Sequence, residues 1–153
     1  MPIHSVLISN MNGALLLSKH FNPDCESWES KIEFERELVR ATRQQWAHCL
    51  EGTEPQFSII GREICVCFQK QGDLLFFVSG TDEYDELALQ EIVTDLIAMV
   101  NIHCEQKTSE EVLLQGDAYG KIVLGVNEMM PQGILEHCTV EEVLRMSKLK
   151  PLK

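Results

Sequence analysis

The sequence lacks an apolar run long enough to cross a bilayer. Its long apolar stretches, such as residues 14–17 and 74–78, are far shorter than the roughly 20 residues that a transmembrane helix needs. The first residues also lack a basic region followed by a long apolar run and a small-residue cleavage site. We therefore expect a cytosolic protein that neither spans a membrane nor is exported.

Basic residues are scarce. Thirteen Lys and Arg stand against 24 Asp and Glu, which gives a formal net charge of -11. A field of this sign repels the phosphates of nucleic acids and of anionic lipids. We therefore expect protein partners with basic patches, no nucleic acid, and contact with membranes only through other proteins.

The six cysteines include no Cys-x-x-Cys pair. Cys65 and Cys67 share one face of an expected strand, at the wrong separation for the usual dithiol chemistry. Adjacent histidine and cysteine occur at three places, but neighbouring helical residues point about 100° apart and structural zinc sites use wider spacings. Those pairs are His48-Cys49, His103-Cys104 and His137-Cys138. Packing as small core hydrophobes is the simpler interpretation, and a metal site or thiol pair is the alternative.

No other segment carries a recognisable catalytic set. Residues 116–121, Gly-Asp-Ala-Tyr-Gly-Lys, have one residue too few between the glycines for a phosphate loop and lack the Ser or Thr after the lysine. The acidic residues in 82–86 suit the first turn of a helix. We therefore expect a protein that is not an enzyme and binds no cofactor, with a small thiol- or metal-dependent enzyme as the alternative.

The chain opens on a predicted β-hairpin. Residues 3–9 and 14–21 are strand-like, and Asn10 to Gly13 between them include the Asn and Gly that tolerate a positive φ. Three leucines in succession, residues 15–17, do not alternate with polar residues. This pattern predicts strands covered on both faces, and we expect the hairpin to form the centre of a sheet, with its turn facing a partner.

Helical periodicity dominates two later segments. Trp28, Ile32, Val39 and Trp46 lie on one face of a helix predicted over 24–50, and apolar residues define a second helix over 82–104. Turn residues separate three short strands between these helices, and three smaller helices follow. The strands are predicted at 56–60, 63–69 and 73–79, and the small helices at 110–114, 117–130 and 140–148.

This order predicts an α+β fold with a five-stranded, largely antiparallel sheet sandwiched between helices. We expect one domain over 1–148 and a flexible C-terminal tail over 149–153.

Two segments resemble the small subunits of vesicle coat complexes: the sigma chains of clathrin adaptors, the zeta chain of coatomer, and the matching subunit of the TSET or TPLATE complex. In VLISNMNGALLLSKHF, residues 6–21, the residues Asn10, Gly13, Leu17, Lys19 and Phe21 fall in place. In VNEMMPQGILE, residues 126–136, the matches are Val126, Glu128, Met129 and Gly133, whereas Asn127 replaces the usual Asp.

The resemblance implies a longin-like domain that serves as a non-catalytic core subunit in vesicle-mediated and protein transport, with clathrin-mediated endocytosis as the expected process. It implies large solenoid and medium subunits as partners, and peripheral membrane association at the plasma membrane, Golgi or endosomes. A longin- or roadblock-like subunit of a tethering or GTPase-regulating complex is the alternative. The expected partner interface comprises Leu16, Phe21, Trp28, Trp46, Glu128 and Met129.

Clathrin adaptor sigma chains usually carry Lys directly after the turn glycine and Arg two residues later, and that Arg helps receive acidic dileucine signals. Ala14 and Leu16 occupy these positions here. The resemblance therefore favours a coatomer- or TSET-like complex over a conventional clathrin adaptor.

Overall fold

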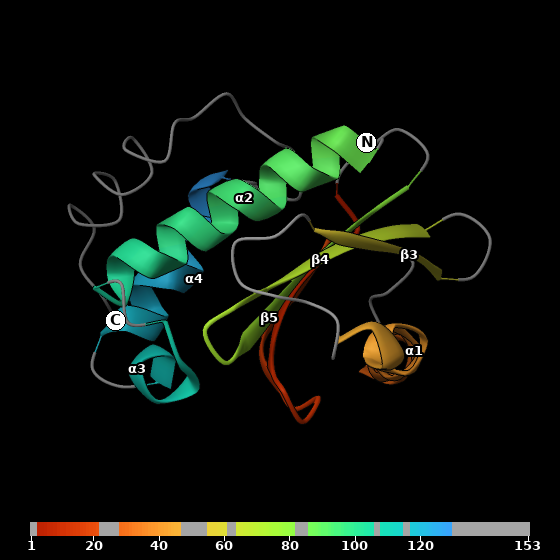
Figure 1. Cartoon of the computed structure of the whole chain (residues 1–153), viewed down its shortest axis with the longest axis horizontal. Helices are drawn as coiled ribbons and strands as arrows, with labels where there is room; N and C mark the ends of the chain where they lie inside the picture. The colour runs from red at the N-terminus through yellow and green to blue at the C-terminus, as the bar shows by residue number, and fades with distance from the viewer. Residues whose placement is uncertain are drawn as a thin grey trace.

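The computed structural model describes residues 3–21, 28–46, 55–60, 64–81, 86–105, 108–114 and 117–129. Nine helices and strands lie within these ranges, in an order that matches the prediction (Figure 1). They are β1 Ser5–Asn10, β2 Leu15–His20, α1 Trp28–Trp46, β3 Gln56–Ile60, β4 Ile64–Gln71, β5 Leu74–Gly80, α2 Glu86–His103, α3 Glu110–Leu114 and α4 Ala118–Met129. The helix predicted at 140–148 and the tail at 149–153 lie outside the described residues.

The five strands form one sheet in the order β2-β1-β5-β4-β3, and every neighbouring pair is antiparallel. Helix α1 lies on one face of this sheet, and α2 and α4 lie on the other (Figure 1). The expected α+β architecture, an antiparallel sheet between helices, is therefore confirmed. No helix among the described residues is both long and apolar enough to span a bilayer.

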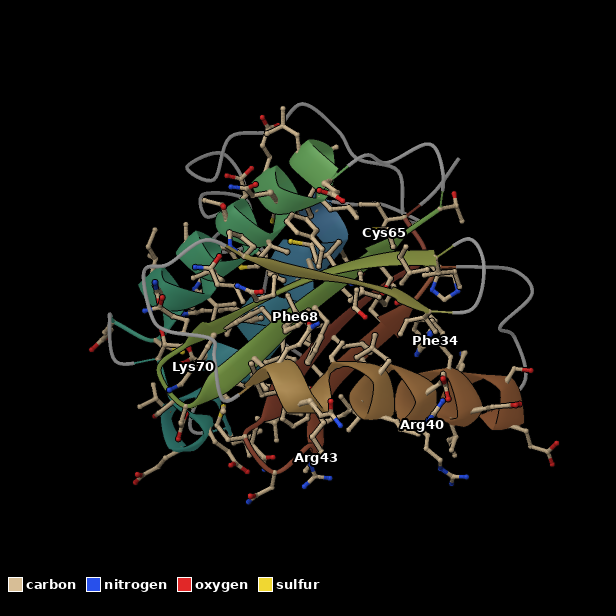
Figure 2. All side chains as sticks on the ribbon, turned by 45° about the vertical axis from the view of Figure 1, so that its right-hand side comes forward. Phe34, Arg40, Arg43, Cys65, Phe68 and Lys70 are labelled. Carbon is tan, nitrogen blue, oxygen red and sulfur yellow. The ribbon has the colours of Figure 1, made fainter. Side chains whose placement is uncertain are left out.

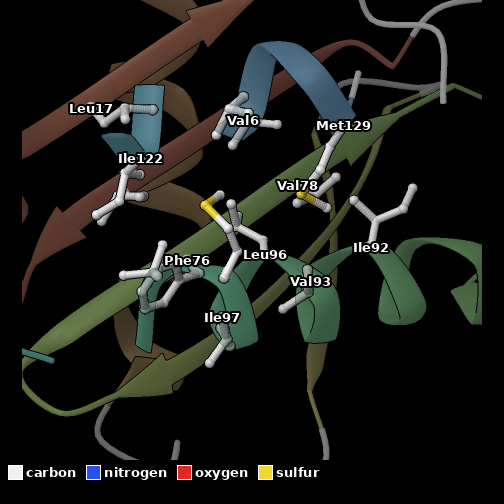
Figure 3. Packing of buried hydrophobic residues seen from close by; sticks show 14 of the residues in the cluster. Val6, Leu17, Phe76, Val78, Ile92, Val93, Leu96, Ile97, Ile122 and Met129 are labelled. Carbon is white, nitrogen blue, oxygen red and sulfur yellow. The ribbon is translucent and has the colours of Figure 1, made fainter. Parts of the chain in front are cut away.

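Alternating side chains explain how one sheet supports two cores. Val6 and Ile8 on β1 enter the cluster beneath α2 and α4, whereas Leu7 between them enters the cluster beneath α1. β5 repeats the pattern, because Phe76 and Phe77 contact opposite layers. Figure 3 shows Val6, Phe76 and Val78 meeting Leu96 of α2 and Ile122 of α4. Residues at alternate positions point to opposite faces, so strands buried on both sides are apolar throughout.

The predicted hairpin turn is confirmed. Gly13 has a φ of 91°, and the side-chain oxygen of Asn10 accepts hydrogen bonds from the amides of Asn12 and Ala14 at 2.9 and 3.0 Å. The side chain therefore takes over part of the backbone hydrogen bonding that a tight turn leaves unmade.

The expectation that the hairpin forms the centre of the sheet was wrong. β5 is the central strand, β1 lies beside it, and β2 is an edge strand. The pairing register shifts between Ile8, opposite Leu17, and Ser9, opposite Leu15. Leu16 is thus the extra residue of a bulge, which directs Leu15 towards the α1 layer while Leu16 and Leu17 pack on the opposite side. A bulge, as well as burial on both faces, accounts for the three successive leucines.

Candidate functional site

The outer edge of β2 exposes backbone hydrogen-bonding groups. The amide of Phe21 donates to the carbonyl of His4 at 3.0 Å, and Lys19 lies opposite Val6. Because the backbone groups of successive strand residues point to opposite sides, those of Ser18 and His20 point away from β1. Within the described part of the chain β2 pairs with β1 alone, and Ser18 and Lys19 are exposed. An extended segment of another chain could therefore reach this edge.

A groove flanks the β2 edge on each face of the sheet. The α1-side groove, of about 480 Å³, is lined by Leu15, Ser18, Lys19, His20, Lys31, Ile32 and Glu35. The α4-side groove, of about 140 Å³, is lined by Leu17, Ser18, Lys19, Tyr119, Val123, Val126 and Asn127. The first groove contains the Lys31 side chain beside the Glu35 carboxylate, and the second is walled mainly by apolar side chains, with the Lys19 side chain on the same face of β2. Lys19 lines both, so the two grooves meet across the edge strand.

Hydrogen bonds organise the floor of the α1-side groove. The hydroxyl of Ser18 donates to Oε1 of Glu35 at 2.6 Å, and Nε2 of His20 lies 3.4 Å from the same oxygen. The His20 side chain is only 3% exposed. Burial lowers the pKa of His20, although the nearby Glu35 carboxylate opposes this change. Glu35 thus joins the edge strand to α1.

His4 lies deeper in the same region. Its ring centroid is 4.4 Å from that of Phe34, and the His20 ring meets Phe34 edge-on at 5.9 Å. Burial, followed by the charge of nearby His20, lowers the pKa of His4 from 6.5 to about 4. His4 is therefore neutral at physiological pH, as a buried imidazole must be to avoid an uncompensated charge.

Acidification should destabilise the fold through His4. The unfolded chain takes up a proton near pH 6.5 whereas the folded chain does so near pH 4, so stability present above pH 6.5 is lost as the pH falls towards 4. The loss should be on the order of 2 kcal/mol at pH 5. Urea unfolding from pH 7.5 to 4.5 measures it. His4→Phe should reduce the dependence of the unfolding free energy on pH, whereas the control His103→Gln, on α2, should leave it unchanged. Equal pH dependence for wild type and His4→Phe would contradict the assignment of this effect to His4.

The cysteines of the described residues are packed in the core. Cys67 and Cys104 are buried, and Cys65 is partly buried against the same cluster. Burial raises the pKa of all three thiols, that of Cys67 to about 12, so they are protonated at neutral pH. The predicted core packing is confirmed for these residues. No group of three His, Cys, Asp or Glu suited to a metal ion occurs in the described ranges, and the pairs at 48–49 and 137–138 lie outside them.

The residues expected at a partner interface fall into two groups. Leu16 and Phe21 are partly buried against the α2 and α4 layer, and Glu128 is half-buried on α4. Trp46 and Met129 are 4% and 5% exposed. The Trp46 indole donates to the Thr42 hydroxyl at 3.0 Å, and Met129 packs beside Val78 and Ile92 (Figure 3). The fold of the chain itself therefore buries these last two side chains. Trp28 is the first residue of α1, and its side chain lies outside the described part.

Residues of the β2 edge were missing from the expected interface, apart from the neighbouring Leu16 and Phe21. Lys19, Lys31, Tyr119 and Val123 come from three elements, so no local motif unites them. One signal was present: after three leucines, the strand turns polar at Ser18, Lys19 and His20. Exposed lysine is typical of edge strands.

Comparison with known proteins supports the resemblance found in the sequence. No protein-family model matches the chain. The chain is 28% identical to TSET complex member tstD of Dictyostelium discoideum over 150 aligned residues. The aligned region covers 97% of this chain and 93% of that protein. This chain also resembles a chain in a homology model of the full-length AP-3 complex in a stretched open conformation, with a TM-score of 0.62 and 16% identity over 95% of this chain and 91% of that chain. The longin-like fold and the resemblance to small coat subunits are thereby confirmed.

Myxococcus xanthus MglB is similar over 60% of this chain and 74% of its own, with 12% identity and a TM-score of 0.38. A likeness of this extent carries no functional argument.

Proposed function

We propose that this chain is the non-catalytic small core subunit of a TSET-like vesicle coat complex, bound to a large solenoid subunit and acting in membrane trafficking. The similarity to TSET complex member tstD carries the proposal, because it extends over nearly the full length of both chains. The longin-like fold agrees with it. Endocytosis at the plasma membrane is the process we propose, with the membrane contacted only through the other subunits.

The described surface suits a scaffold that larger subunits enclose. Both sheet faces are already covered by the chain's own helices, so partners can reach only the outer helix faces, the loops and the two sheet edges. Large apolar side chains are exposed on several of these elements, and obligate interfaces are rich in such residues. They are Ile59 on β3, Leu87 and Ile102 on α2, and Leu114 on α3, each 41–67% exposed.

The charge of α2 indicates the chemistry of its partner. Its exposed acids are Glu86, Glu91 and Asp95, and the helix contains neither Lys nor Arg. Glu91 and Asp95 are one turn apart, and burial followed by the charge of Glu91 raises the pKa of Asp95. Basic side chains on the solenoid subunit would relieve this repulsion. Such pairing contributes mainly to specificity and association rate.

Cargo capture is not the role that we propose. Ala14 and Leu16 replace the cations expected on β2 for acidic dileucine signals, and Leu16 packs against the core. We propose a structural role in the coat instead, in which this domain supports the larger subunits.

Affinity purification of the tagged full-length chain from its native cells, followed by mass spectrometry, tests the proposal. We expect a large solenoid chain and a medium chain in stoichiometric amounts, retained through a high-salt wash. Recovery of the chain alone would overturn the proposal. Recovery with a GTPase and its regulators instead would favour a tethering or GTPase-regulating complex.

A further inference from the structure

β2 is one of the two edge strands of the sheet, and among the described residues it pairs with β1 alone. Between two grooves it presents the backbone groups of Ser18 and His20, which pair with no strand among the described residues. Side chains of an extended strand point alternately to opposite faces of a sheet. A segment that paired with this edge would therefore place its side chains in the α1-side and α4-side grooves in turn.

We infer that the β2 edge binds a short extended segment of a partner coat subunit, which adds to the sheet as a sixth strand. The inference rests on the proposed function and identifies how one partner attaches. Main-chain hydrogen bonds supply affinity in strand addition, and pockets for alternate side chains supply specificity. The bulge at Leu16 interrupts the regular pairing pattern, so the added segment follows the half of β2 beyond Leu16.

The lining of each groove defines the side chain that it accepts. Leu17, Tyr119, Val123 and Val126 line the α4-side groove, whose volume of about 140 Å³ suits a single aliphatic side chain. The α1-side groove carries Lys31 on α1, whereas its one acid, Glu35, already accepts the hydrogen bond of the Ser18 hydroxyl. The Lys19 side chain lies on the α4 side of β2, because Lys19 pairs with Val6 and its ammonium lies 5.9 Å from the centroid of the Phe21 ring. The partner segment should thus alternate an aliphatic residue with an acidic one.

Charge also explains the selectivity of the edge. An exposed lysine on an edge strand protects it against indiscriminate pairing, because burying the ammonium group is costly. The other edge, β3, carries the exposed Ile59 but lines neither groove.

Proline at position 18 tests the backbone pairing. Ser18→Pro removes an amide that points outward, and proline is tolerated in edge strands at such positions. Its matched control, Ser18→Ala, also loses the hydroxyl bond to Glu35 but keeps the amide. In quantitative affinity purification, we expect Ser18→Pro to lower recovery of the partner subunit about tenfold, whereas Ser18→Ala remains within about twofold of wild type.

Each outcome has a distinct meaning. If wild type recovers no partner, the proposed function fails. If wild type, Ser18→Ala and Ser18→Pro recover the partner equally, strand addition is overturned and the proposed function stands. If Ser18→Pro does not fold, as judged by circular dichroism, hydrogen exchange on wild type decides. Amides of residues 17–21 should exchange more slowly in the purified complex than in the free chain, and unchanged exchange would reject the inference.

Charge reversal tests the acidic residue of the partner segment. Lys31→Glu should reduce recovery of the partner severalfold, because the new carboxylate repels the acid that enters the α1-side groove. Lys70→Glu introduces the same change on β4 (Figure 2), which β1 and β5 separate from β2. Equal effects of the two variants would show that only net charge matters and would overturn the predicted acidic contact.

Discussion

Replacing Phe77 by alanine is expected to lower the free energy of unfolding by about 3–5 kcal/mol. Phe77 is fully buried on β5, the central strand. Its ring stacks on Phe68 with centroids 5.7 Å apart and lies 6.2 Å from the Trp46 ring. Truncation would remove the contacts of a large side chain and leave a cavity between the sheet and α1. Figure 2 shows Phe68, the stacking partner of Phe77, on the side of the sheet that α1 covers.

Urea denaturation followed by far-ultraviolet circular dichroism measures this loss. Ile59→Ala is the matched control, because it also shortens an apolar strand residue but at a site that is 67% exposed. The control should change stability by no more than about 0.5 kcal/mol. Similar losses for the two variants would mean that the α1 layer does not stabilise the sheet as its packing implies.

Gly72→Ala is expected to have a comparable effect through the backbone, with a loss of about 2–5 kcal/mol. Gly72 adopts a φ of 63° in the turn between β4 and β5. A Cβ placed there would lie 1.9 Å from the carbonyl oxygen of Thr108, just before α3. Neither the Thr108 carbonyl nor the turn can move without disturbing neighbouring hydrogen bonds. One of these is the bond that the Glu110 amide donates to the Asp73 carboxylate at 2.9 Å.

The other hairpin provides the control for this prediction. Gly13 also has a positive φ, of 91°, but a Cβ there would meet only side-chain atoms of Trp46 and Val39, at 3.4 Å. Gly13→Ala should therefore cost about 1–2 kcal/mol, mainly for the left-handed conformation. If thermal unfolding ranks Gly13→Ala as the more damaging change, the close approach of Thr108 is not what requires glycine at position 72.

Most elements could be predicted because local patterns specify them. β3 was predicted to the residue, and β4 and β5 to within two residues at either end, since turn residues separate apolar runs. The second long helix was predicted at 82–104 and α2 is described at Glu86–His103, with seven buried apolar residues on its inner face. The order of the elements, together with the resemblance, was sufficient to predict the layered longin-like fold.

The candidate site could be predicted only in part. For Trp46 the sequence left both core packing and partner contact open, because a helical periodicity identifies an apolar face without identifying what covers it. The Thr42 hydroxyl and the Phe77 ring cover Trp46 within this chain. The grooves beside β2 depend on residues 100 positions apart, such as Lys19 and Tyr119, which no local pattern connects.

The sequence by itself determined the elements, the two apolar faces of the sheet strands and the acidic surface, because each follows from residues close together along the chain. Tertiary structure alone decided which strand is central and which is at the edge. That order depends on long-range backbone pairing: β1 bonds to β5 across some 70 residues, and α1 carries the chain from one edge of the sheet to the other. Within the described residues the same pairing leaves one side of β2 without a neighbouring strand, and the proposed attachment of a partner strand depends on that open side.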